Sequence, residues 1–370
     1  MEKYKNMKTR KMANLKMIRN LIFFVLLIIF TFWYIFKDQD LNELKNVVTS
    51  ANITYIFIGF LLMLGSYLME SINIRCILIS LGEKRFSIFR ALKFTSVGAF
   101  FSAITPGSTG GQPAEVYYMT KDGIKATNGT LAMLMELCAF QISSILLSVI
   151  CGILNPSLLD SGIIWFYILG IVVNGCALTG MMLGMFSNKL TRKFINFVIK
   201  MMEKTKVKGY EKKKIKLEEG LNQYIESARF IKENKSVFIK SILRVFVQVS
   251  LYHSIPYFIY RAFGLHELSY FNLFSMQAIL YTTVAAIPVP GSIGVSESLF
   301  MKLYGIAFSK TLISGAMLLF RFVSFYIYII IFSFVVITNA IKSKNIVGEI
   351  DKDVREIEKD FDDDKKLVYS

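Results

Sequence analysis

The sequence predicts an all-α polytopic membrane protein with about six transmembrane helices, two opposed re-entrant hairpins and an inverted repeat. Hydrophobic residues make up 54% of its 370 residues. A soluble protein of this length has no interior large enough to hide so much apolar surface, so part of its solvent must be lipid. Two Pro-Gly-Ser-x-Gly sequences interrupt apolar runs, and proline with clustered glycine ends helices.

Six apolar runs are long enough to cross about 30 Å of hydrocarbon, which takes roughly 20 helical residues. A basic segment, residues 1–17, precedes them, and a charged tail, residues 341–370, follows a transmembrane domain expected over residues 18–340. The predicted spans are residues 18–36, 53–81, 130–154, 162–186, 237–260 and 311–340.

The basic residues set the expected orientation. Seven lysines and arginines lie in the first nineteen residues, and fourteen lie against six acidic residues in the connection 187–235. The positive-inside rule therefore places the N-terminus, this connection and the C-terminal tail in the cytoplasm. Leu190, Phe194 and Phe197 recur among lysines at helical spacing, so we expect a basic amphipathic segment on an anionic leaflet. The formal charge of +16 then reflects topology and lipid contact, and nucleic acid is not an expected partner.

The first motif, TPGSTGG at residues 105–111, lies between two spans that leave and re-enter the membrane on the same side. Residues 86–125 must therefore cross the membrane twice or not at all. The leg before the motif is apolar, but the leg after it is short and polar, which argues against a full return crossing. We expect a re-entrant hairpin that enters from the cytoplasm. Its tip comprises Pro106, Gly107, Ser108, Gly110 and Gly111.

The second motif, VPGSIG at residues 289–294, follows the same logic with the sides reversed. Residues 270–287 form an apolar leg and residues 295–307 a short leg back, so this hairpin enters from the exterior. Opposed hairpins are typical of inverted repeats, whose broken helices meet near the midplane and form a site. The competing interpretation is that both motifs are ordinary loops outside the lipid. The second tip comprises Pro290, Gly291, Ser292 and Gly294.

Six ionisable side chains within or beside the apolar segments are the candidate site residues. A charge near the centre of a bilayer is costly, so it needs a partner or water. The arginines could hold a phosphate through forked hydrogen bonds, and the glutamates could meet a cationic group or carry protons. Structural ion pairs within the bundle are the alternative. The six residues are Glu70, Glu115, Glu136, Arg244, Glu297 and Arg321.

The sequence predicts no metal site, cofactor or catalytic residue. The four cysteines all lie in apolar segments without a Cys-x-x-Cys spacing, and the chain holds two histidines, too few for a histidine-rich metal site. No Gly-x-x-x-x-Gly-Lys-Ser/Thr loop occurs, so nucleotide-driven pumping is not expected. His253, in the fifth predicted span, is expected to form a hydrogen bond with a neighbouring helix.

The segments TPGSTGGQPAEVYYM and IPVPGSIGVSE together resemble the flippase-type membrane domain of the lysylphosphatidylglycerol synthase/flippase family, the multiple peptide resistance factors. The resemblance covers roughly residues 16–340 and implies a flippase-like transmembrane domain in the bacterial cell membrane. It also implies translocation of a modified phospholipid, such as lysylphosphatidylglycerol, between leaflets. Resistance to cationic antimicrobial peptides would follow from that activity.

In full-length relatives of that family, a soluble domain transfers the aminoacyl group to phosphatidylglycerol. Only thirty residues follow Ala340, too few for such a domain, so the family's lysyltransferase label is not expected to describe this chain. The expected partners are anionic or aminoacylated phospholipids, a separately encoded lipid synthase and a second copy of the chain. An ion-coupled secondary transporter of small solutes and a phosphatidylglycerol lysyltransferase remain the alternative functions.

Overall fold

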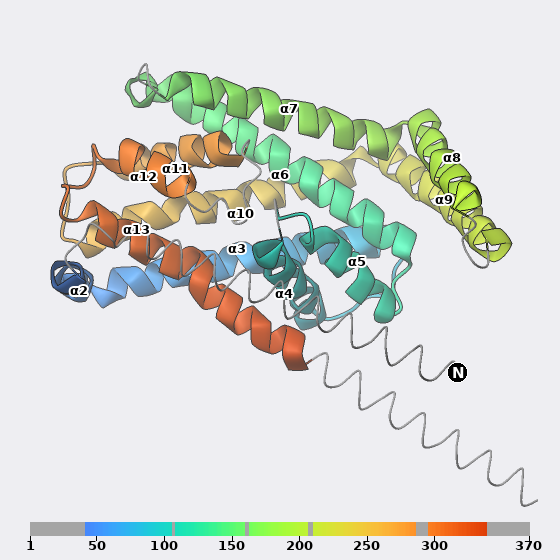
Figure 1. Ribbon diagram of the computed structural model, residues 1–370, viewed down its shortest axis with the longest axis horizontal. Helices are drawn as coiled ribbons and strands as arrows, with labels where there is room; N and C mark the ends of the chain where they lie inside the picture. Colours follow the sequence, from blue (N-terminus) through green and yellow to red (C-terminus); the bar gives the residue numbers. More distant parts are fainter. Residues whose placement is uncertain (1–40, 106–107, 160–162, 206–209, 286–294, 339–370) are drawn as a thin grey trace, which may run out of the picture.

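The computed structural model describes residues 41–105, 108–159, 163–205, 210–285 and 295–338. All regular secondary structure in these ranges is helical (Figure 1). The short helix η2 (Pro156–Leu158) separates α6 from α7, and the π-helical turn η4 (Phe322–Tyr326) follows α13 directly. The α-helices are α2 (Leu41–Ser50), α3 (Ile53–Ser80), α4 (Ile88–Ile104), α5 (Gly111–Lys121), α6 (Ala126–Leu154), α7 (Ile164–Phe186), α8 (Asn188–Lys204), α9 (Tyr210–Glu233), α10 (Lys235–Ala262), α11 (Tyr270–Ala285), α12 (Val295–Tyr304) and α13 (Ile313–Arg321).

Among the described residues, five helices are long and apolar enough to cross a membrane: α3, α6, α7, α10 and the helix that continues from α13 through η4 to Thr338. They coincide with five of the six predicted spans, which confirms an all-α polytopic membrane protein. The first predicted span, residues 18–36, lies outside the described residues. The 28 residues of α3 make about 42 Å of helix, so this span must tilt or extend beyond the hydrocarbon.

Two pairs of shorter helices stand where the hairpins are predicted. α4 packs on α5, and α11 packs on α12. Each pair lies between two spans in chain order, with α3 and α6 around the first pair and α10 and α13 around the second. Figure 1 shows α4 and α5 nearer the end of the bundle that carries α8 and α9, and α11 and α12 at the end that carries α2. The turn of the second hairpin, residues 286–294, lies outside the described residues.

The two halves of the chain meet along an antiparallel pair of spans, α3 and α10. Near the start of α3, the Asn52 amide donates to the Ala262 carbonyl at 2.8 Å. Further along, the Ser66 hydroxyl donates to the Gln248 carbonyl at 3.1 Å. A Cβ added to Gly65 would lie 3.3 Å from the leucine side chain it faces on α10, so a small residue there permits the close approach of the two helices.

Two apolar clusters flank the middle of this pair. One contains Met63 of α3 with residues of α10, α11, α12 and α13. The other contains Ile74 of α3 with residues of α4, α5, α6, α7 and α9. Between these two positions α3 carries Glu70 and Asn73. The fold therefore places polar side chains at the junction of two apolar cores.

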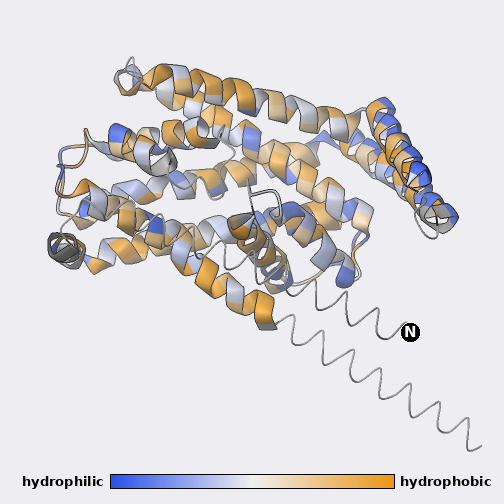
Figure 2. Cartoon of the chain, in the orientation of Figure 1, coloured by the Kyte–Doolittle hydropathy of each residue, from blue (hydrophilic) through white to orange (hydrophobic). Residues whose placement is uncertain are grey.

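The basic connection forms two helices, α8 and α9. Figure 2 shows hydrophobic residues along the spans and a mixture of hydrophilic and hydrophobic residues on α8 and α9. Leu190, Phe194, Phe197 and Met201 lie on one face of α8 and are all exposed. An exposed apolar face beside a charged face is the pattern of a helix that lies on a membrane surface.

Candidate functional site

A group of hydrogen-bonded polar side chains, here called the polar network, links α3, α6 and α10 between the two apolar clusters. Asn73, Glu136, Ser241 and Gln248 are buried, whereas the other two members are half-buried. Because α3 and α6 come from the first half of the chain and α10 from the second, the network forms only when the halves pack together. The members are Glu70, Asn73, Glu136, Ser241, Arg244 and Gln248.

Asn73 is the central member of the network. Its Nδ2 donates to Glu136 Oε2 and, at 2.9 Å, to the Ser241 hydroxyl. Its Oδ1 accepts a hydrogen bond of 3.1 Å from Arg244 Nη1. The amide therefore connects a guanidinium to a carboxylate, and the charge of Arg244 acts on Glu136. Both charged groups keep further hydrogen-bonding positions for a third group.

Glu70 joins the network through α10. Gln248 Nε2 donates to Glu70 Oε2 at 3.4 Å. The Glu70 carboxyl also acts electrostatically on Tyr67 and Tyr281, so it lies between the network and a group of interior tyrosines. Tyrosine offers both a hydrogen-bonding hydroxyl and an apolar ring, which suits the wall of a path for an amphipathic ligand.

Glu115 brings the first hairpin to the same region. It lies on α5, is 5% exposed, and acts electrostatically on Glu70 and Glu136. Its carboxyl group rests against Gly98 of α4, where an added Cβ would overlap it. Three like charges so near one another repel when ionised, so this region attracts cations and protons.

Three oxygen atoms in this region have no hydrogen-bond partner among the described residues. They are Glu115 Oε2, Glu136 Oε1 and Gln248 Oε1, and all three are buried. Buried polar atoms in native proteins are nearly always hydrogen-bonded. Because all three are acceptors, a ligand with several N–H or O–H donors, or protons, would satisfy them.

Arg321 lies at the end of α13, where the helix widens into the π-helical turn η4. The half-buried guanidinium sits over the Phe325 ring, 5.7 Å from its centroid, and its charge acts on Tyr252. A π-helical turn inside a span is rare and frequent at functional sites. Tyr252 also packs against Tyr281, with ring centroids 5.8 Å apart, so the tyrosines lie between Arg321 and Glu70.

The tip of the first hairpin requires small residues. A Cβ on Gly111 would lie 2.8 Å from the Gly98 carbonyl oxygen, closer than real side chains approach a backbone. The Gly110 amide donates to Thr105 Oγ1 at 2.9 Å, which closes the turn. Ser108 has a φ of 56°, in the left-handed region that side chains rarely adopt.

Pro106, Gly107 and the second tip, with Pro290, Gly291, Ser292 and Gly294, lie outside the described residues. Glu297 belongs to α12, but its side chain is also outside them.

His253 does not behave as expected. It is 1% exposed, and neither ring nitrogen has a partner in the described part of the chain, so the expected hydrogen bond to another helix is absent there. Its ring packs instead against Phe274, at 5.6 Å, and Tyr281, at 5.9 Å, between centroids. In the described ranges no cluster of histidine, cysteine, aspartate or glutamate could hold a metal ion.

The sequence did not single out Asn73, Ser241 or the tyrosines. Asn73 stands three residues after Glu70, and Ser241 stands three before Arg244. Residues three apart share a helical face, so the spacing could have identified both. The tyrosines carry no such signal, because an aromatic residue in an apolar span is usually part of the core.

Two comparisons with known proteins place the chain among its relatives. A UPF0104 membrane protein of Archaeoglobus fulgidus is 25% identical over 324 residues, which cover 85% of this chain and 96% of that protein. The family model described as "Lysylphosphatidylglycerol synthase TM region" matches residues 20–331. Because that match spans most of the sequence, the chain belongs to the family of lysylphosphatidylglycerol synthase transmembrane regions.

Proposed function

We propose that this protein moves the headgroup of a modified phospholipid, such as lysylphosphatidylglycerol, between the leaflets of the cell membrane. The headgroup passes the polar network while the acyl chains stay in lipid. Both chain ends and helices α8 and α9 face the cytoplasm in this proposal, because the basic residues gather there. The activity would support resistance to cationic antimicrobial peptides.

The observation that carries the proposal is the pairing of both signs of charge with unpartnered acceptors in one interior region. Arg244 offers a guanidinium, and Glu115 and Glu136 each offer a buried oxygen that has no hydrogen-bond partner in the described part of the chain. A lysylated phospholipid carries a phosphate and ammonium groups. The guanidinium would hold the phosphate through charge-assisted hydrogen bonds, and the glutamates would accept hydrogen bonds from the ammonium groups.

The hairpin supplies the means of access. A broken helix ends inside the membrane region and exposes backbone groups that a continuous span keeps within itself. The α5 helix begins at Gly111, so the positive end of its dipole favours an anion at the tip. Glu115 follows one turn later, which puts an anion-binding tip and a cation-binding side chain on one short helix.

The family assignment supports a lipid substrate, since its description names the membrane region of an aminoacyl-lipid synthase. An aminoacylated lipid needs an enzyme to make it, so a separately encoded synthase is the expected partner. A second candidate function, ion-coupled transport of a small solute, draws on the three interacting carboxyl groups of Glu70, Glu115 and Glu136, because such groups carry protons or cations in transporters.

A leaflet assay tests the proposal. The full-length protein is reconstituted into liposomes that contain fluorescent lysylphosphatidylglycerol or fluorescent phosphatidylglycerol, and dithionite quenching reports the accessible lipid. Arg244→Gln and Arg321→Gln should slow the exchange of both lipids. Lys240→Gln is the matched control, because Lys240 lies one turn before Arg244 on α10 but is exposed.

The outcomes separate the two candidate functions. Fast exchange that Arg244→Gln slows and Lys240→Gln leaves unchanged supports lipid translocation past the network. Folded protein that exchanges neither lipid would contradict the proposal. Uptake of a soluble substrate driven by a proton gradient, without lipid exchange, would establish the transporter in its place.

A further inference from the structure

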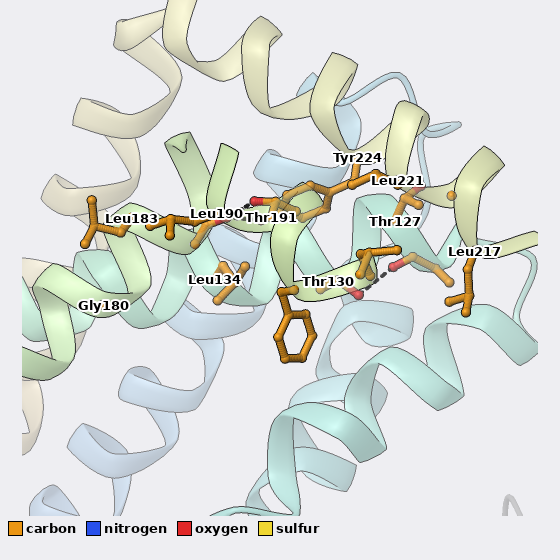
Figure 3. A pocket seen from close by; sticks show the side chains of 15 residues that line it. Thr127, Thr130, Leu134, Gly180, Leu183, Leu190, Thr191, Leu217, Leu221 and Tyr224 are labelled. Carbon is orange, nitrogen blue, oxygen red and sulfur yellow. Dashed lines mark hydrogen bonds between the residues drawn. The ribbon is translucent and has the colours of Figure 1, made fainter. Parts of the chain in front are cut away.

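A cavity lies where the ends of α6 and α7 meet α8 and α9 (Figure 3). Its volume is about 740 Å³, within the range of small-molecule sites. Figure 3 shows lining side chains from all four helices, and most of them are apolar, such as Leu134, Leu183 and Leu221. No member of the polar network lines the cavity, so it is a separate feature of the molecule.

Three glycines keep this space open. Gly180 and Gly184 lie on α7, and Gly220 lies on α9. A Cβ added to Gly180 or Gly184 would meet no atom within 4 Å, and one added to Gly220 would lie 3.9 Å from Thr127 Cγ2. Glycine weakens a helix relative to alanine, and no neighbouring atom among the described residues requires the small size of these three glycines. The volume that the missing side chains leave is therefore available to another molecule.

The mouth of the cavity is apolar and open. Leu183, Leu190 and Phe194 line it and are 48%, 44% and 64% exposed. In a multi-pass protein, exposed apolar side chains at the end of a span face the acyl chains and the headgroup boundary. Lipid is therefore the medium into which this cavity opens.

Three exposed cations stand beside the mouth. The first turns of α8 carry these cations, Lys189, Arg192 and Lys193. They are interspersed with residues that line the cavity, Leu190, Thr191 and Phe194. In the part of the chain that the structure describes, none of the three forms a salt bridge with a carboxylate. At about 100° per residue, Lys193 projects roughly 60° from Leu190, so its charge borders the apolar mouth.

We infer that this cavity binds one acyl chain of an anionic phospholipid, whose headgroup rests on the cations at the start of α8. The apolar wall and the glycine-lined space fit the chain, and the cations complement a phosphate. This site is independent of the proposed translocation path and would anchor α8 and α9 to the leaflet.

The experiment measures lipid retention by the full-length protein. The protein is stripped of lipid in detergent and titrated with dioleoyl phosphatidylglycerol or dioleoyl phosphatidylcholine. Native mass spectrometry counts the retained lipids, and the melting temperature reports stabilisation. Gly180→Leu and Gly220→Leu fill the cavity. Gly175→Leu is the matched control, since Gly175 is also on α7 and also has no atom within 4 Å of an added Cβ, but it does not line the cavity.

The wild type and Gly175→Leu should retain one phosphatidylglycerol more than Gly180→Leu or Gly220→Leu, and the filled variants should lose most of the lipid-induced rise in melting temperature. Arg192→Gln and Lys193→Gln should each lower the preference for phosphatidylglycerol over phosphatidylcholine by about fivefold. Both effects should appear whether or not the protein moves lipid between leaflets.

Two results would overturn the inference. Equal retention of phosphatidylglycerol by Gly180→Leu, Gly220→Leu and Gly175→Leu would show that no lipid occupies the cavity. A filled cavity that leaves lipid retention unchanged but disrupts a dimer, or alters the protection of residues 1–40 against proteolysis, would assign the cavity to a second copy or to another segment of this chain.

Discussion

Replacing Gly98 by alanine should displace the Glu115 side chain that packs against it. The effect on stability and on lipid exchange measures the importance of the contact between Gly98 and Glu115. Glu115 is 5% exposed, and an added Cβ at Gly98 would overlap its carboxyl group. Either α4 and α5 separate or the carboxyl group leaves its place. In both cases Glu115 no longer faces Glu70 and Glu136, so we expect Gly98→Ala to slow lipid exchange strongly.

The cost in stability follows from two opposing terms. Overpacking of a filled interior costs about 1–3 kcal/mol, and an overlap with a whole carboxyl group belongs at the upper end. Alanine returns about 1 kcal/mol of helix propensity relative to glycine, so the net loss is about 2 kcal/mol. At roughly 2 °C per kcal/mol for a chain of this size, the melting temperature should fall by about 4 °C.

A double-mutant cycle separates packing from function. Glu115→Ala removes the group that the new methyl would strike, so Gly98→Ala should keep only its helix-propensity gain of about 1 kcal/mol in that background, and the coupling energy should equal the whole overpacking cost of about 3 kcal/mol. Lipid exchange should remain lost in the double variant, because the carboxyl group is absent. Gly175→Ala, with no atom within 4 Å of its added Cβ, is the control and should keep or raise stability. A penalty that persists without Glu115 would refute the contact.

Three further perturbations should change the stability of the folded protein in different directions. Asn73→Leu removes the bridge between Arg244 and Glu136 and should lower stability by about 3 kcal/mol, seen as a lower melting temperature. His253→Phe keeps the ring packing and removes two buried nitrogens that have no partner among the described residues, so the melting temperature should stay level or rise. Burial alone would raise the pKa of Asp122, but the Arg90 hydrogen bond and the nearby positive charges outweigh it and lower that pKa. The interaction of ionised Asp122 with these positive charges stabilises the folded state. This contribution is present above the unfolded pKa of about 4 and is lost as pH falls through the lower folded pKa. As pH falls through that folded pKa, the hydrogen-exchange rate of amides in α4 and α5 should therefore rise in the wild type but not in Asp122→Asn.

Much of the fold was predictable because membrane insertion imposes simple rules. Apolar length fixed five spans to within a few residues, and parity of crossings required the segment between α3 and α6 to return to its starting side. Proline and clustered glycine then located its turn. These signals are local or additive along the chain, so a single sequence carries them.

The site was only partly predictable, because it depends on which faces meet. Lys240, Arg244 and Gln248 follow one another at i, i+4 and i+8, a spacing that is typical of one shared helical face. Each step of four residues turns the helix by about 40° beyond a full circle. The row therefore moves from exposed Lys240 through half-buried Arg244 to buried Gln248. The sequence contains the row, but the packing of α3 against α10 decides which of its members enter the network.

The length of α5 explains why the hairpin and the network meet. Its 11 residues span about 16 Å, roughly half of a 30 Å hydrocarbon layer. An arm of that length that starts at one face ends near the midplane. Glu70 lies ten residues before the end of α3 at Ser80, which is about 15 Å of helix, so it stands at a similar depth. A continuous helix could bring Glu115 to that depth, but its backbone would be fully hydrogen-bonded within itself. The broken helix brings the carboxyl group and the positive end of a helix dipole together, and this combination can receive both a cation and an anion from one headgroup.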